Sequence, residues 1–266
     1  MAASLALLAA AACTSDRIPL RYGLEPGRTL DYSVRLDARV RRVLQGAPTE
    51  QRLVASFRSR QTITEDLGDG RARARITLEP ISLTVDGRAV APGPPQEFVV
   101  GLSSDGSVVE VESASGAPSE VLVPVGLDRL LPRLRPVLPP GPVSPGDSWA
   151  SDLDLSDSSG RLSLDLSSRL AQLGLASGHR SALIRSSYTS PVERRETFEN
   201  AIADIRGRDV GAQAAWFSLQ GFLVRARSDS VGDYEVTFRP PGGDAGTGTV
   251  SGTLRVVLHT EMELEG

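Results

Sequence analysis

The stretch Leu30–Arg41, LDYSVRLDARVR, decides the fold. Its even-numbered positions are apolar, and its odd-numbered positions are polar or charged throughout. Successive side chains of a β-strand point to opposite faces, so this period of two predicts a strand with one dry and one wet face. Parallel strands are buried on both faces and have continuous apolar runs instead. The stretch therefore predicts an antiparallel sheet with one side in water.

The same alternation recurs between turn-forming residues in the rest of the first half. The apolar parity switches around Pro80, from Leu78 to Ile81 and Leu83, which predicts a bulge or corner. The predicted elements of this half are the strand Gln51–Glu65, the turn 67–70, the strand Arg71–Val85, the turn Asp86-Gly87, the strand Glu97–Leu102, the turn 103–106 and the strand Ser107–Glu112. In the second half, strands are predicted around 162–166, 222–226, 234–238 and 249–258.

Two segments carry a helical pattern instead. Leucines 127, 130, 131 and 134 have the spacing of one helix face, although Pro132 and Pro136 would keep that helix short. The sequence Ser190-Pro191-Val192-Glu193 has the form of a capping box with proline at the first helical position. Apolar residues at 198, 201, 202 and 205 and a stop at Gly207 then predict a helix near 191–206. A strand is the alternative, because Phe198 and Ile202 share a parity.

The expected fold is mainly β: a large curved antiparallel sheet, half-barrel-like, with one or two short helices. The expected divisions are a signal peptide 1–12, a lipidated tether 13–24, a β-rich half 25–135, a Pro/Gly-rich connector 136–146 and a second β-rich half 147–266. Both halves open with Pro-Gly-x-(Thr/Ser)-large apolar, at 26–30 and 145–149. Two similar halves would explain this repeat, and so would recurring turn chemistry.

Composition excludes several classes of function. The chain has 266 residues, 40% hydrophobic and 23% charged, with 29 basic and 33 acidic residues. A net charge of −4 does not suggest a nucleic-acid surface. Every basic residue is arginine, so Schiff-base lysines, phosphate-loop lysines and Ser-x-x-Lys nucleophiles are excluded.

The N-terminus predicts export. Residues 1–12 are an uncharged, alanine-rich run with the length of a signal-peptide core. The single cysteine, Cys13, follows Ala10–Ala12 directly, which resembles a bacterial lipobox. That resemblance implies that Cys13 is lipidated on sulfur and amine and becomes the first mature residue. Because Thr14 rather than Asp follows it, a host with two membranes would place the protein on the outer membrane, facing the periplasm. An ordinary signal peptide followed by a free thiol is the alternative.

Most of the mature chain resembles an uncharacterised family of bacterial envelope lipoproteins. The matching segments are Leu20-Arg21-Tyr22, the opening 26–34, the motif Pro142-Val143-Ser144-Pro145-Gly146-Asp147-Ser148-Trp149 and the segment 178–184. The resemblance implies strands at 20–22 and 178–184 and a leucine-bearing helix before the motif. At the level of fold the chain resembles the one-sided curved sheets of lipoprotein carriers such as LolA and LppX. The resemblance supplies no catalytic residues.

No group of residues satisfies the needs of a catalytic or metal site. His179 follows a turn, and His259 lies at the wet parity of its predicted strand, too far from other ligands for zinc. Asp152, Asp154 and Asp157, with Asp147 upstream, lack the glycine and distal glutamate of a calcium loop. The glycine-rich stretch 242–248 precedes a strand, whereas phosphate loops precede a helix. The remaining candidates are the arginines 35, 39 and 41, which suggest a solvated face or one for anionic headgroups, and Trp149 and Trp216, assigned to core or rim.

The sequence therefore predicts a membrane-anchored, non-catalytic lipoprotein without metal or cofactor, whose ligand-binding residues are unknown. Two roles stay open. The protein binds a lipid or other apolar ligand in the concave face of its sheet, or it is a structural or adaptor protein that binds an envelope protein. Whether the concave face is filled distinguishes the two.

Overall fold

In the computed structural model the described residues are 17–116, 122, 134–154, 160–198, 201–240 and 248–266, and their named elements are all strands. In chain order the strands are β1 Thr29–Leu44, β2 Ala47–Gly68, β3 Arg71–Val85, β4 Arg88–Val90, β5 Gln96–Ser103, β6 Val108–Ser115, β7 Ser148–Asp154, β8 Gly160–Ala176, β9 His179–Phe198, β10 Ala201–Ser218, β11 Phe222–Arg239 and β12 Val250–Leu264.

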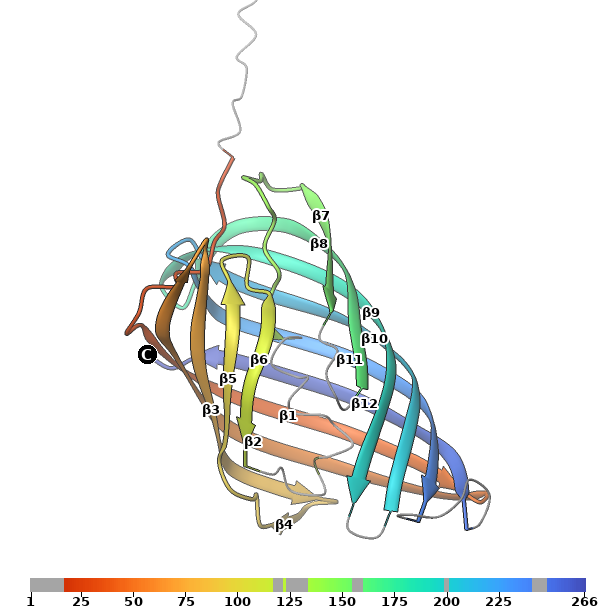
Figure 1. Cartoon of the computed structure of the whole chain (residues 1–266). Coiled ribbons are helices and arrows are strands. Elements are labelled where there is room, and N and C mark those ends of the chain that lie inside the picture. Colours follow the sequence, from red (N-terminus) through yellow and green to blue (C-terminus); the bar gives the residue numbers. More distant parts are fainter. Residues whose placement is uncertain (1–16, 117–121, 123–133, 155–159, 199–200, 241–247) are drawn as a thin grey trace, which may run out of the picture.

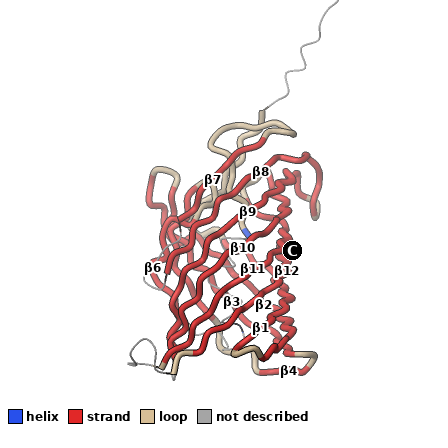
Figure 2. Tube along the Cα trace, turned by 90° about the vertical axis from the view of Figure 1, so that its right-hand side faces the viewer, coloured by secondary structure: helices blue, strands red, loops and turns tan. Residues whose placement is uncertain are grey.

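The strands form one sheet in the order β6-β5-β3-β2-β1-β12-β11-β10-β9-β8-β7, with β4 paired to β3. Neighbours pair antiparallel, and β1 beside β12 joins the two halves of the chain. The sheet curls into a half-barrel whose two edges are β6 and β7 (Figures 1 and 2). The expected mainly-β class with a large curved antiparallel sheet is confirmed.

The strand β1 contains the stretch that predicted the fold. Tyr32, Val34, Leu36, Ala38 and Val40 share one face of β1 and are 0–3% exposed. They pack with apolar residues of β2, β10, β11 and β12 in the largest core cluster. The wet parity of β1 faces outward, as its alternation predicted.

Two-residue turns fix the register of four hairpins. In Gln45-Gly46, Asp69-Gly70, Asp86-Gly87 and Ser177-Gly178 both residues have positive φ, 46–51° at the first and 69–82° at the second. This is the type I′ turn, whose twist matches that of the flanking strands. The turn predicted at 67–70 is found at Asp69-Gly70, since β2 continues to Gly68, and the turn predicted at Asp86-Gly87 is confirmed.

The parity switch near Pro80 is a β-bulge. Phe57 pairs with Pro80 and Ser56 with Ser82, so Ile81 is the extra residue. Leu83, 2% exposed, then resumes the inner face. The expectation that Ile81 joins that face is wrong, because the bulge leaves its side chain 55% exposed.

The helix predicted near 191–206 is wrong, and the alternative of a strand holds. Residues 191–198 belong to β9 and 201–206 to β10. Pro191 has no N–H to donate, and the β8–β9 pairing passes from Leu162↔Val192 to Asp165↔Thr189 around it. Pairing on both sides, to β8 and to β11, outweighs a capping signal that spans only four residues. Gly207, predicted as a helix stop, instead lets the backbone of β11 approach closely at Asp233.

The predicted leucine-bearing helix lies mostly outside the described residues, which do not include 127, 130 and 131. Leu134 is described and fully buried in the main core cluster. Among the described residues that follow it, Pro136–Pro139 form no helix or strand. Within the connector 136–146, Val137 and Leu138 are buried.

The motif Pro142–Trp149 has a structural role that its turn chemistry explains. Ser144-Pro145-Gly146-Asp147 closes a turn with an N–H···O bond of 3.0 Å and a glycine φ of 101°. Glu25-Pro26-Gly27-Arg28 closes a similar turn, with 3.1 Å and 86°. Val143 pairs with Ile18 in an isolated bridge. Leu20-Arg21-Tyr22, implied to be a strand, forms none, although the Leu20 and Tyr22 side chains are buried.

Candidate functional site

A row of buried polar side chains crosses the inner face of the second half. The row occupies one register position on five neighbouring strands. Its members are Ser168, Ser186, Gln213, Ser228 and Thr260, each at most 6% exposed. The Ser168 and Ser186 hydroxyls bond each other at 2.8 Å. We call this set the inner polar row; on β8, β9 and β12 apolar side chains lie on both sides of it along the strand.

A buried carboxylate lies two inward-facing positions from the row, with Gly211 between them. Asp209, 3% exposed, is four residues before Gln213 on β10 and accepts a hydrogen bond from the Tyr234 hydroxyl. Two glycines make room for the tyrosine rings here. A Cβ at Gly211 would collide with Tyr188, and one at Gly232 would collide with Tyr234. The inner face of β9–β11 is therefore built around polar groups as well as apolar ones.

A buried guanidinium lies against the described part of the N-terminal segment. Arg135 is 7% exposed, and its Cζ is 4.9 Å from the centre of the Tyr22 ring. The Tyr22 hydroxyl donates to the Pro136 carbonyl at 3.3 Å, and that of Tyr32 to the Leu223 carbonyl at 3.1 Å. Burial raises the pKa of Tyr22 to about 12 and raises that of Tyr32 as well, so both stay neutral donors.

Several buried polar atoms, on β2, on β12 and at Arg135, have no hydrogen-bond partner. They are the hydroxyls of Ser59 and Thr260, Nε2 of Gln61 and one terminal nitrogen of Arg135. Most buried polar groups in folded proteins are hydrogen-bonded, and leaving one unpaired costs about 1–3 kcal/mol. All four side chains are at least 93% buried and belong to the inside of the half-barrel. Such orphaned groups are candidates for contact with a bound molecule.

The inner face is also covered by the chain itself. Leu122 and Leu134, from between β6 and β7, pack in the main core cluster. Val137 packs against Leu164, Leu166 and Tyr188, and Leu138 packs against Tyr22 and Phe217. A ligand on this face would share it with the connector or displace part of it.

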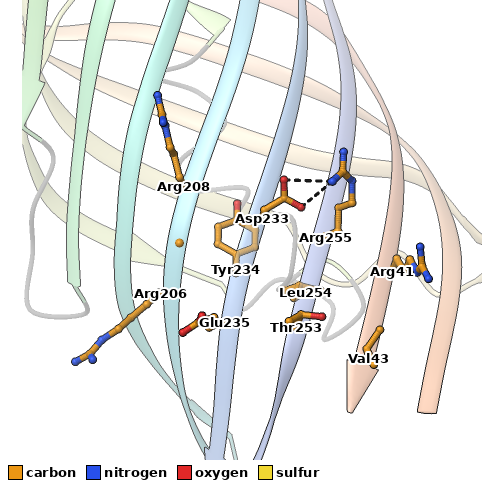
Figure 3. Close-up of a pocket in the computed structure, with 11 residues that line it drawn as sticks. Arg41, Val43, Arg206, Arg208, Asp233, Tyr234, Glu235, Thr253, Leu254 and Arg255 are labelled. Atoms are coloured by element: carbon orange, nitrogen blue, oxygen red, sulfur yellow. Dashed lines mark hydrogen bonds and ion pairs between the residues drawn. The ribbon is translucent and has the colours of Figure 1, made fainter. Parts of the chain in front are cut away.

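The hollow in Figure 3 lies on the outer face, across β1, β12, β11 and β10. Its volume is about 700 Å³, and four arginines, 41, 206, 208 and 255, line it together with Asp233 and Glu235. Arg255 bonds Asp233 at 3.0 and 3.3 Å, and Arg206 pairs with Glu193 at 3.0 Å. The Arg41 and Arg208 side chains point away from each other in the close-up. The charges are mixed and do not converge on one point, as an anion site requires.

The arginines predicted on β1 lie on the same outer face. Arg52 and then Arg39 and Arg35 lower the pKa of Asp37. Arg35 lies opposite Glu261, and Arg41 lies opposite Glu50. The interleaved carboxylates make this a solvated, mixed-charge face.

The two histidines lie far apart in the sheet. The His179 ring stacks edge-on against Phe222, with centroids 5.0 Å apart, directly after the Ser177-Gly178 turn. His259 faces outward, 30% exposed, with Nδ1 2.7 Å from Asp229 and Nε2 3.2 Å from Glu261. No nucleophile joins either ring among the interactions of the described residues.

The acidic candidates are not brought together. Asp152 and Asp154 are exposed on the edge strand β7, and Asp157 lies outside the described residues. Asp147 accepts the Ser144 amide and pairs with Arg17 at 3.1 Å, and these two contacts lower its pKa. Within the described part of the chain no cluster of three His, Cys, Asp or Glu side chains could hold a metal. Cys13 and the stretch 241–247 also lie outside the described residues.

The tryptophans pack as core or rim residues. The Trp149 indole donates to the Val137 carbonyl at 2.9 Å and joins the motif to the connector. Trp216 lies over Gly174, where a Cβ would be 3.4 Å from the ring, and beneath Arg225, whose Cζ is 5.9 Å from the ring centre.

The sequence patterns did not single out the inner polar row. A signal for it exists: Gln213 shares the parity of Ala215 and Phe217, and Thr260 shares that of Leu258 and Met262. Polar residues at strand positions that share a face with apolar residues indicate that the inner face does not consist of apolar side chains alone. The signal was obscured on β10 because residues up to 206 were interpreted as a helix. Arg135 has no such signal, since it lies on no strand.

No family model and no curated protein matches the chain. Among solved structures, OccK2 (OpdF) of Pseudomonas aeruginosa aligns with 91% of this chain and 100% of its own, at 8% identity and a TM-score of 0.23. Similarity at that level supports no conclusion about fold or function. In the part of the chain that the structure describes, no helix has the length and apolar character needed to cross a membrane.

Proposed function

We propose that this protein is a non-catalytic lipoprotein of the bacterial cell envelope, anchored through Cys13, that binds a lipid or other amphipathic ligand on the inner face of its sheet. The observation that carries the proposal is the pairing of two features on one face. Apolar clusters cover most of it, and buried polar atoms without partners interrupt them. A ligand with an apolar body and a polar group would complement both features, and ligand sites generally have this mixed composition.

Native mass spectrometry tests the binding. The chain would be exported to a bacterial periplasm with Cys13→Ser, purified without detergent, and its bound lipids extracted. We expect a stoichiometric adduct of an amphipathic molecule. A bare protein mass that persists after incubation with lipid vesicles would contradict the proposal.

The anchor needs a separate test, since the ligand site and the tether are independent. In cells given a radiolabelled fatty acid, we expect the wild-type chain to be labelled and to sediment with membranes. Cys13→Ser should abolish the label. A labelled Cys13→Ser chain, or an unlabelled wild-type chain, would contradict lipidation at this residue.

The exposed edge of β6 favours a second candidate function, that of an adaptor. Within the described residues β6 pairs only with β5, and its Val109 and Val111 are 51% and 55% exposed. An unpaired edge with exposed valines can accept a strand from another protein. Chemical cross-linking in isolated cell envelopes should then recover a partner protein. The double variant Val109→Lys/Val111→Lys should abolish that recovery. Unchanged cross-links in that double variant would eliminate the edge as the docking site.

A further inference from the structure

We infer that Arg135 anchors an anionic headgroup, so that the ligand of the inner face is an anionic amphiphile. This inference rests on the proposed function and assigns the chemistry of its ligand. Arg135 lies where three apolar clusters meet. Its sequence neighbours Leu134, Val137 and Leu138 belong to three different clusters of the inner face.

The charge of Arg135 is poorly compensated in the described residues. Arginine stays protonated in proteins, and a buried charge without a paired counter-charge is strongly unfavourable. No carboxylate lies within ion-pair distance of this guanidinium in the described part of the chain, and one of its terminal nitrogens has no acceptor. Tyr22, whose ring centre is 4.9 Å away, supplies a cation–π contact and a hydrogen-bonding interaction through its hydroxyl, but it carries no counter-charge.

The neighbouring groups leave the guanidinium available to an anion. Tyr22 and Tyr32 direct their hydroxyls to the carbonyls of Pro136 and Leu223, so neither hydroxyl satisfies the free nitrogen. Asp105, which interacts electrostatically with Tyr22, bonds the Ser103 hydroxyl and the Ser107 amide of its own turn. A carboxylate or phosphate would supply the missing acceptor, because arginine matches both groups with parallel N–H···O bonds.

The apolar surroundings define the rest of the ligand. Phe217, 4.7 Å edge-on from the Tyr22 ring, and Leu138 pack with Tyr22 in one apolar cluster, and Leu134, next to Arg135 in the chain, belongs to the main core cluster. An acyl chain extending from an anionic group at Arg135 would lie against these clusters. Free phosphate has no apolar part, so it would bind weakly even beside the same guanidinium.

The test uses the full chain with Cys13→Ser and three probes: oleate, oleyl alcohol and inorganic phosphate. Arg135→Met keeps an apolar side chain of similar length, and Arg135→Lys keeps the charge. Arg41→Met, on the outer face, is the matched control. We expect oleate to bind wild type and the control alike, and Arg135→Met to weaken it about tenfold or more, as expected for a lost charge-assisted bond. Arg135→Lys should retain most of the binding, and phosphate alone should bind at least tenfold more weakly than oleate.

Oleyl alcohol separates failure of this inference from failure of the proposed function. We expect it to bind wild type and Arg135→Met equally. If oleate and the alcohol bind equally well and Arg135→Met changes neither, the ligand site stands and the anionic anchor is refuted. If neither amphiphile binds wild type, both proposals are refuted. Tight binding of phosphate alone would also refute the inference that the ligand is an amphiphile.

Thermal unfolding provides an independent measurement. Because an uncompensated buried charge destabilises the unliganded protein, Arg135→Met should raise the Tm of the ligand-free chain. Oleate should then raise the Tm of wild type and leave that of Arg135→Met nearly unchanged. A lower Tm for ligand-free Arg135→Met would mean that the guanidinium stabilises the fold, which contradicts an anchor kept for a ligand.

Discussion

The two faces of this sheet carry their polar groups in opposite ways. On the outer face, charges pair across neighbouring strands in water, as in Arg52–Asp37 at 2.5 Å and Arg60–Asp31 at 2.8 Å. On the inner face, Thr260 and Arg135 are buried, and each has a polar atom without a partner. Outer pairs of this kind contribute little to stability, whereas buried unpaired groups reduce it. This difference indicates that the outer polar groups serve solubility and strand register. The buried, unpaired polar groups of the inner face instead require a functional explanation.

The largest difference between the faces in the free energy of unfolding should come from substitutions of neighbouring residues of β1. Leu36 is fully buried, so Leu36→Ala should lower the free energy of unfolding by about 2–5 kcal/mol. Arg35→Ala, one residue away on the outer face, should change it by less than about 0.5 kcal/mol. Urea unfolding followed by circular dichroism measures both. Similar losses for the two variants would mean that the faces are not distinct.

Gly207 tests the close approach of strands on the inner face. A Cβ at this position would collide with the backbone oxygen of Asp233, so Gly207→Ala should cost about 1–3 kcal/mol. Gly141→Ala in the connector is the control, because no atom lies within 4 Å of its added Cβ. Chemical denaturation of the pair should show a loss only at 207. An unaffected Gly207→Ala would mean that β10 and β11 are farther apart than described.

How much of this fold the sequence predicts depends on whether a feature is decided by local residues or by pairing with other strands. The alternation of Leu30–Arg41 and the turn pairs Asp69-Gly70 and Asp86-Gly87 are local, and they predicted strands and hairpins correctly. The helix near 191–206 was predicted from an equally local capping signal, and it failed because pairing with β8 and β11 decides that segment.

The candidate site was harder to predict because it, too, depends on pairing between segments that are distant in the chain. The inner polar row exists only once five strands are placed in register, since its members are far apart in the chain. Burial of Arg135 depends on how the connector crosses the inner face, and no local pattern encodes that path. The predicted anchor at Cys13 stays a prediction, because it lies outside the described residues.

Removing the Thr260 hydroxyl should change the stability by less than the substitutions above and in the opposite direction. Its hydroxyl is fully buried and unpaired, so Thr260→Val should stabilise the ligand-free protein by roughly 1 kcal/mol. Thr253→Val, on the exposed parity of the same strand, should be nearly neutral. Differential scanning calorimetry can resolve the pair. Destabilisation by Thr260→Val would indicate that the hydroxyl is satisfied in solution.

The smallest effect concerns an outer ion pair and its pH dependence. Arg52 lowers the pKa of Asp37, so the pair stabilises the fold above the unfolded-state pKa of about 3.9 and loses this contribution as pH falls through the lower folded pKa. Arg52→Gln should therefore destabilise slightly at pH 7 and not at all once Asp37 is protonated in both states. NMR titration should show a higher Asp37 pKa in the variant. An unchanged Asp37 pKa would mean that the contact does not persist in solution.

Photo-cross-linking with a diazirine-bearing fatty acid tests the central claim most directly, because it reports which face of the sheet the ligand touches. Adducts would be mapped by peptide mass spectrometry on the full chain carrying Cys13→Ser. We expect labelling of inner-face positions around Arg135, such as Tyr22, Leu138 and Phe217, with competition by unlabelled oleate. Labelling confined to exposed outer-face residues such as Val210 and Val257, 48% and 41% exposed, would contradict an inner-face ligand site.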